Sequence, residues 1–239
     1  MTMTQRLILL IVALMVADVA FALVSEDDIN RAYYASDVAE LEEIRAELNE
    51  EDPNDAYLAG YIDWRIASIH MSIGDGDAAD VVLERGQATL ESLVERVPDT
   101  ADGWALLSTT YGMRIGIKPM SRGMSMGGKA DRSIERALRL EPENPRVLVI
   151  FAIGKLNTPA LFGGGSDEAL EALDSAIASL AANGSGRYAW GEADAYIWRG
   201  IARQRQGDLE SAAADFDAAL DAVPSYGWAE HLRANVYAD

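Results

Sequence analysis

Two histidines and one glycine-rich stretch are the residues of this sequence that come nearest to recognisable chemistry. His70 and His231 are the only histidines and lie far apart in the chain, so no paired-histidine metal motif is present. Residues 123–130 have the glycine and lysine spacing of a phosphate-binding loop. However, Ala130 follows Lys129 where such a loop needs a hydroxyl group to meet magnesium. We therefore predict neither a metal site nor a nucleotide site.

No catalytic group stands out either. The 39 Asp and Glu residues are spread along the whole chain, so no acid and base pair can be singled out. Cysteine is absent, which excludes disulfides, thiolate metal sites and a cysteine nucleophile. Residues 163–168 could offer backbone amides to an anion at a helix start, but Ser166 as a helix cap explains the same pattern. We expect no catalytic residues, no cofactor and no enzyme activity.

The most unusual composition lies between residues 113 and 132. This stretch contains a single acid, Asp131, beside five cations and four methionines. The methionines could fold back and fill gaps in a core, contact the acidic and apolar segment of a partner, or form a methionine-only copper site. The cations are Arg114, Lys118, Arg122, Lys129 and Arg132, and the methionines are Met113, Met120, Met124 and Met126. The five tryptophans of the chain are expected to serve packing.

Charge and composition limit the classes of partner. The net charge of −19 repels phosphate backbones, so we expect no nucleic-acid binding. With 239 residues, 49% of them hydrophobic, the chain can bury a sizeable core.

The N-terminus has the pattern of a secretory signal. Arg6 precedes an apolar run from residue 7 to residue 17, and Ala20, Phe21 and Ala22 form a small-x-small cleavage pattern. We predict a signal peptide at 1–22, cleaved after Ala22, and a periplasmic or secreted domain at 23–239. The alternative is an uncleaved anchor, although the apolar run is shorter than the roughly 20 residues that cross a bilayer. We expect no stable membrane span after cleavage.

An internal repeat organises the rest of the chain, and segment 193–224 shows it best. Gly200 and Ala212 are small residues that would let two antiparallel helices approach closely. Phe216 would fill the space between these helices, and Pro224 would end the second one. Because no stretch shows the strict alternation of a strand, the fold class is predicted to be all-α.

Further units follow the same spacing. One begins near residue 101 and another near residue 145, with inserted loops at about 115–127 and 157–165. Weaker patterns predict helices at 38–48, 57–71 and 86–98, and a last helix at 226–236 that caps the array.

These residues resemble the tetratricopeptide superfamily over most of the mature chain. Three stretches, 116–129, 157–165 and 224–228, resemble a little-characterised group of exported bacterial tetratricopeptide proteins. The middle stretch is also faintly similar to the T-component of TRAP-type solute transporters. The resemblance implies a right-handed superhelical array of helix pairs that binds a protein or peptide on its concave face, and it brings no catalytic residues.

The resemblance also indicates where a partner would bind. The first helices of the units would line the concave face, and the two insertions would overhang it. The expected contact residues are Thr109, Met113, Arg114, Lys118, Arg122, Arg146, Ile153, Asn157 and Arg205. We therefore predict an exported scaffold or adaptor for a protein partner. The alternative is a small-ligand-binding accessory component of a solute uptake system, which a cavity closed by an insertion would favour.

Overall fold

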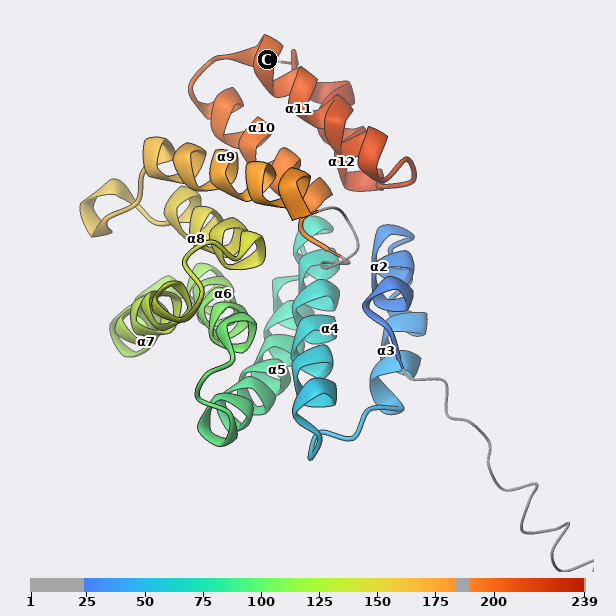
Figure 1. Cartoon of the computed structure of the whole chain (residues 1–239), viewed down its shortest axis with the longest axis vertical. Helices are drawn as coiled ribbons and strands as arrows, with labels where there is room; N and C mark the ends of the chain where they lie inside the picture. Colours follow the sequence, from blue (N-terminus) through green and yellow to red (C-terminus); the bar gives the residue numbers. More distant parts are fainter. Residues whose placement is uncertain (1–23, 184–189, 239) are drawn as a thin grey trace, which may run out of the picture.

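The computed structural model describes residues 24–183 and 190–238, and all regular elements in these ranges are helices (Figure 1). The helices follow one another as antiparallel pairs, so the predicted all-α array of helix pairs is confirmed. The predicted signal segment 1–22 lies outside the described residues. The pairs are α2 (Glu26–Tyr34) with α3 (Val38–Ala46), α4 (Pro53–Ser72) with α5 (Gly76–Arg96), α6 (Ala101–Ile117) with α7 (Pro119–Leu140), α8 (Pro145–Asn157) with α9 (Ser166–Asn183), and α10 (Glu192–Arg205) with α11 (Leu209–Ala222); α12 (Gly227–Asn235) follows them.

Short polar side chains mark where most of these helices begin. Such side chains accept hydrogen bonds from the backbone amides that the first helical turn leaves without a partner. Proline occupies the first position of α4, α7 and α8, where its missing amide hydrogen is not needed. The capping residues are Ser25, Asp37, Asp52, Asp75, Thr100, Asn144 and Asp208.

Glycine allows the two helices of a pair to approach closely at specific points. A Cβ atom at Gly200 would lie 2.5 Å from the Phe216 ring, which confirms the small and aromatic positions expected from the repeat. A Cβ atom at Gly86 would lie 2.8 Å from that of Asp63. These distances are too short for any side chain, so both contacts depend on glycine.

The first expected insertion, at about 115–127, does not form a loop. The helices α6 and α7 run through it, and Lys118 alone separates them. Pro119 starts α7 rather than breaking it, because a proline at the first helical position is tolerated. The extra residues therefore lengthen the α6–α7 hairpin, which packs beside the equally long α4–α5 hairpin.

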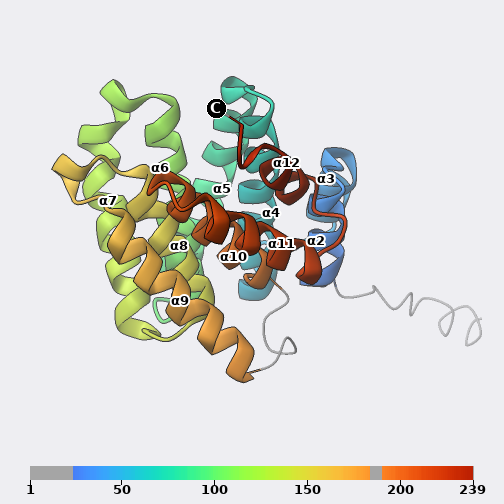
Figure 2. The same cartoon turned by 90° about the horizontal axis from the view of Figure 1, so that it is seen from above.

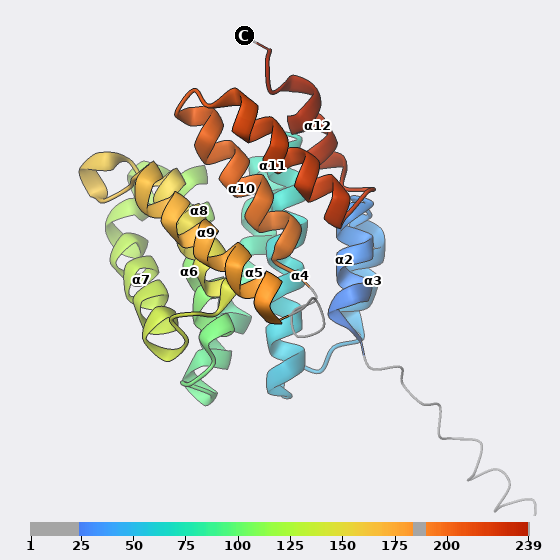
Figure 3. The ribbon, with the colours of Figure 1, turned by 45° about the horizontal axis from the view of Figure 1, so that its top comes forward.

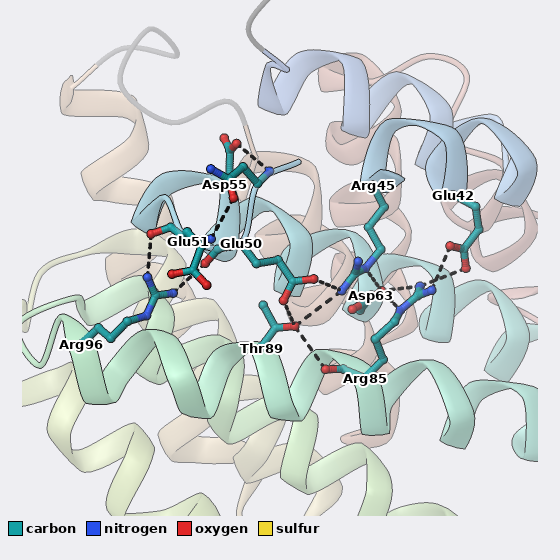
Figure 4. A network of polar contacts seen from close by, with 10 residues as sticks. Glu42, Arg45, Glu50, Glu51, Asp55, Asp63, Arg85, Thr89 and Arg96 are labelled. Atoms are coloured by element: carbon teal, nitrogen blue, oxygen red, sulfur yellow. Dashed lines mark hydrogen bonds and ion pairs between the residues drawn. The ribbon is translucent and has the colours of Figure 1, made fainter. Parts of the chain in front are cut away.

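A partly buried ion-pair network attaches the short helix α3 to the long α4–α5 hairpin (Figure 4). The fully buried Asp63 accepts hydrogen bonds from Arg45 at 2.8 Å and from Arg85 at 2.6 Å, both at Oδ1. Burial raises the pKa of Asp63 even though both arginines oppose the shift. Arg85 also binds Glu42 with both terminal nitrogens, at 3.0 Å each. This network therefore holds α3, α4 and α5 together.

The inner helices α2, α4, α6, α8 and α10 all run in the same direction, upward in Figure 3. The turns at their C-terminal ends therefore lie along one edge of the array. We call this the turn edge; its turns comprise residues 34–38, 72–76, 117–119, 157–166 and 205–209. In the described ranges, no helix has the length and apolar character needed to cross a membrane.

Candidate functional site

The space between the inner helices is filled by the protein itself. Trp190, which is 2% exposed, lies just before α10 and stacks on Tyr61 of α4 with ring centroids 5.2 Å apart. Its indole nitrogen donates a hydrogen bond to the Tyr57 hydroxyl at 3.1 Å. The expected open concave face is therefore occupied here by an aromatic side chain of the same chain.

Arg65 of α4 and Asp194 of α10 form a buried ion pair across this interior. The guanidinium donates to both carboxylate oxygens, at 3.0 and 2.7 Å, and each side chain is at most 2% exposed. Its Nε donates to the Tyr61 hydroxyl at 2.9 Å, and the Tyr33 ring lies 4.2 Å from its central carbon. Burial opposes the charge of Arg65, but Asp194 raises the pKa of the guanidinium well above its usual value. The pair joins the second unit to the last.

Further contacts connect helices that lie far apart in the sequence. The hydroxyl groups of Tyr33 in α2 and Tyr226 before α12 are 3.0 Å apart. Arg146 at the start of α8 donates to Glu26 of α2 at 3.0 Å and to the Tyr57 hydroxyl at 3.2 Å. Figure 2 shows α2 and α12 near each other although they lie at opposite ends of the sequence.

A small polar pocket of about 310 Å³ opens where the inner helices begin, away from both insertions. Asp102 lines it beside Arg146, with 3.4 Å between a carboxylate oxygen and a guanidinium nitrogen. Burial raises the pKa of Asp102. No group of three or more acidic or histidine side chains in the described ranges could hold a metal ion. The other lining residues are Glu26, Pro53, Asn54, Tyr57, Leu93, Val97 and Thr100.

One carboxylate holds three cations of the α6–α7 hairpin. Asp80 of α5 accepts hydrogen bonds from Arg122 at 2.7 Å, Lys118 at 2.9 Å and Arg114 at 3.3 Å. The hydrogen bond from Arg122, with those from its two neighbours, holds the pKa of Asp80 well below its usual value. Three of the five cations named from the sequence are therefore paired with a carboxylate of the preceding hairpin.

Three methionines of this hairpin divide between two roles. Met113 and Met126 pack against the main core, as the packing alternative predicts. Met124 is 99% exposed on α7 and contributes nothing to that core.

The second insertion, 157–165, forms a compact turn that presents two hydrophobic side chains to solvent. Its 3-10 helix η1 (Ala160–Phe162) leaves Leu161 88% and Phe162 75% exposed. The Lys155 ammonium group donates to the Gly163 carbonyl at 3.0 Å, and the Gly165 amide donates to the Lys155 carbonyl at 3.1 Å. These bonds fix the turn at the end of α8, so the exposed pair is held in a defined place.

The turn edge gathers exposed hydrophobic surface of this kind. Seven large hydrophobic side chains of the described residues are strongly exposed. Each of them lies in a connection between helices at this edge, in the segment after α12, or in a helix within two helical turns of such a connection. Their collection along one edge makes this edge the candidate contact surface of the described residues. They are Met71, Ile73, Val81, Met124, Leu161, Phe162 and Tyr237.

Comparison with known proteins identifies the fold. The sequence matches no protein-family model and no curated protein. Among solved structures, TTC0263, a thermophilic TPR protein of Thermus thermophilus, superposes with a TM-score of 0.56 and 20% identity, over 85% of this chain and 90% of that one. This chain has a tetratricopeptide-repeat fold. The HusA haemophore of Porphyromonas gingivalis superposes with a TM-score of 0.57 and 27% identity, over 77% of this chain and 96% of that one.

The tetratricopeptide array places the nine predicted contact residues in two groups. Thr109, Arg114, Arg146 and Ile153 are buried, which corrects the expectation that they line an open groove. Their burial follows from the filled interior and, for Arg114, from its pairing with Asp80. The others lie wholly or partly at the surface of the turn edge, and their binding role stays a prediction. They are Met113, Lys118, Arg122, Asn157 and Arg205.

Sequence reasoning missed the closure of the tetratricopeptide array. Arg65 and Asp194 are 129 positions apart, and no local pattern couples them. One signal was available: Asp63 and Arg65 are charges within a helix whose other residues from 56 to 67 are apolar or glycine. Charges that interrupt such a helix must find buried partners.

Proposed function

We propose that this chain is an exported adaptor that binds a protein partner at its turn edge. The observation that carries the proposal is the pair Leu161 and Phe162, exposed on a turn whose backbone is fixed. The filled interior supports the same surface, because a peptide could enter between α4 and α10 only by displacing Trp190 and the Arg65–Asp194 pair. Export to the periplasm or beyond rests on the sequence pattern of residues 1–22.

Binding of a partner at this turn would yield a substantial gain in free energy. Burial of a large hydrophobic side chain is worth roughly 1.5–3 kcal/mol. The hydrogen bonds of Lys155 and Gly165 already order the turn, so binding does not have to supply that ordering free energy. Phe162 and Leu161 therefore have the properties of anchor residues.

A photo-crosslinking amino acid at position 162 tests the proposal in the source cell. We expect it to capture a defined protein, and Leu161→Ser to reduce that capture. The same amino acid at Ser92, an exposed residue of α5 far from the turn edge, is the matched control. Equal capture at both positions, or none at position 162, would reject the turn edge as the contact surface.

A carrier for a small amphipathic ligand, coupled to solute uptake, is the second candidate. The similarity to HusA, a haemophore, favours it. The turn edge offers Met124 and Phe162 as apolar contacts and Lys118, 47% exposed, as a partner for a ligand carboxylate. Titration with haem followed by absorbance tests this function. Saturable haem binding that is weakened by Phe162→Ser would support the carrier function. Absence of haem binding would reject it.

A further inference from the structure

The half of the α6–α7 hairpin that lies toward the turn edge contains no acid, in a chain that is otherwise strongly acidic. Residues 103–130 include neither Asp nor Glu, although the whole chain has 39 of them. Three of its cations, Arg114, Lys118 and Arg122, form ion pairs with two acids of α5, Asp80 and Glu84, so these five side chains together carry one net positive charge. An acidic partner is repelled by most of the protein's surface and attracted here.

Apolar surface lies beside this charge. Met124 is 99% exposed on α7, and a thioether side chain adapts to differently shaped partners. Leu161 and Phe162 extend from the neighbouring hairpin at the same edge. The two hairpins are in contact through α6 and α8. A partner that covers these side chains must therefore be apolar on one side.

Open space in front of the hairpin would let such a partner approach its backbone. A Cβ atom at Gly112 or Gly116 of α6, or at Gly123 or Gly127 of α7, would meet no atom within 4 Å. Glycine inside a helix is about 0.5–1 kcal/mol less favourable than alanine, and packing does not require it here. These glycines do not themselves make a site, but they leave room next to Met124.

We infer that the partner presents an acidic, amphipathic α-helix that lies across the tip of the α6–α7 hairpin. The inference rests on the proposed function and names the chemistry of its partner. The apolar side of the helix covers Met124, Leu161 and Phe162, and its acidic residues face Lys118. The described chain offers helices and turns at this edge and no open strand, so a strand-adding peptide has no sheet to join.

Binding of three synthetic peptides to the protein, followed by fluorescence anisotropy, tests the inference. The probes are an amphipathic helix of about 18 residues of Leu, Ala and Glu, a scrambled peptide of the same composition, and an amphipathic peptide with Lys in place of Glu. We expect the acidic amphipathic peptide to bind at least about ten-fold more tightly than the other two. Its affinity should fall as salt is added.

Substitution of the glycines that border open space distinguishes an effect on peptide binding from an effect on folding. We expect the double variant Gly116→Leu and Gly123→Leu to weaken peptide binding at least about ten-fold without lowering the melting temperature. The control is Ala88→Leu on the exposed face of α5, which should leave binding unchanged. Equal binding of acidic and basic peptides, or no effect of the glycine variants, would overturn the inference.

Two further outcomes separate this inference from the proposal on which it rests. If position 162 captures a protein in cells while the acidic peptide does not bind, the adaptor function stands and the helix inference fails. The second outcome uses vesicles of phosphatidylcholine with about one third phosphatidylglycerol. If the protein sediments with these vesicles in a way that depends on Met124 and Phe162, while the peptides do not bind, the edge faces a membrane and the inference is overturned.

Discussion

Asp80 shows how a single side chain determines the conformation of a segment that looks unusual in the sequence. Arg114, Lys118 and Arg122 lie 34–42 positions away from it, in the next repeat unit. The composition of the segment was therefore readable from the sequence, but its partner was not. A carboxylate is a suitable partner because the extended α6–α7 hairpin brings three cations to one point on α5.

Replacement of Asp80 by asparagine should destabilise the protein in a pH-dependent way. The pKa of this carboxyl is lowered from 3.8, so its ionised form is favoured in the folded state. The stabilisation is fully present above about pH 4–5 and is lost as the pH falls through the unfolded and then the folded pKa. At pH 7 we expect Asp80→Asn to lower the free energy of unfolding by roughly 2–3 kcal/mol.

Urea denaturation between pH 7 and pH 2.5 measures this effect. The difference between wild type and variant should shrink as the pH falls below 4. Asp77→Asn, at an exposed position of the same helix, is the control and should change stability little. A constant difference across this pH range would contradict the role given to the Asp80 charge.

At the level of the helix pairs, the repeat pattern predicted the units well and their lengths poorly. The spacing of small and large residues identified Gly200 with Phe216 because this contact is local to one pair. The repeat spacing left extra residues at about 115–127 and suggested a loop, whereas the segment is helical and α7 packs against α6 and α8. Helix propensity is a weak guide where a neighbouring hairpin supplies the packing.

Alanine at different glycines should change stability in opposite directions. Gly200→Ala forces a Cβ atom against the Phe216 ring, 2.5 Å away, and should lower the free energy of unfolding by roughly 1–3 kcal/mol. Gly112→Ala enters open space within a helix and should raise it by up to about 1 kcal/mol. Denaturant unfolding of both variants checks the signs, and a loss of stability at Gly112 would show that its surroundings are not open.

Across the whole molecule, contacts between distant units set this chain apart from an open solenoid. In an open array each repeat contacts only its neighbours, so stability is a sum of local terms. Here Arg65 contacts Asp194, 129 residues further along the chain, and Tyr33 contacts Tyr226, 193 residues further along. Such contacts cannot be read from a repeat pattern, which describes only how each unit packs on the next. They make the two ends of the array depend on each other.

This dependence predicts one cooperative unfolding transition that a single substitution divides. In wild type, tryptophan fluorescence and far-UV circular dichroism should report the same melting temperature, because Trp64 and Trp190 lie at the junction. The variant Arg65→Met leaves Asp194 buried without its guanidinium partner, so the free energy of unfolding should fall by roughly 3–5 kcal/mol.

In this variant the fluorescence transition should occur at a lower temperature than the loss of helix. Arg31→Met, which removes two exposed ion pairs, should change stability little and keep the two transitions together. If Arg65→Met leaves the transitions coincident, the units do not depend on this pair.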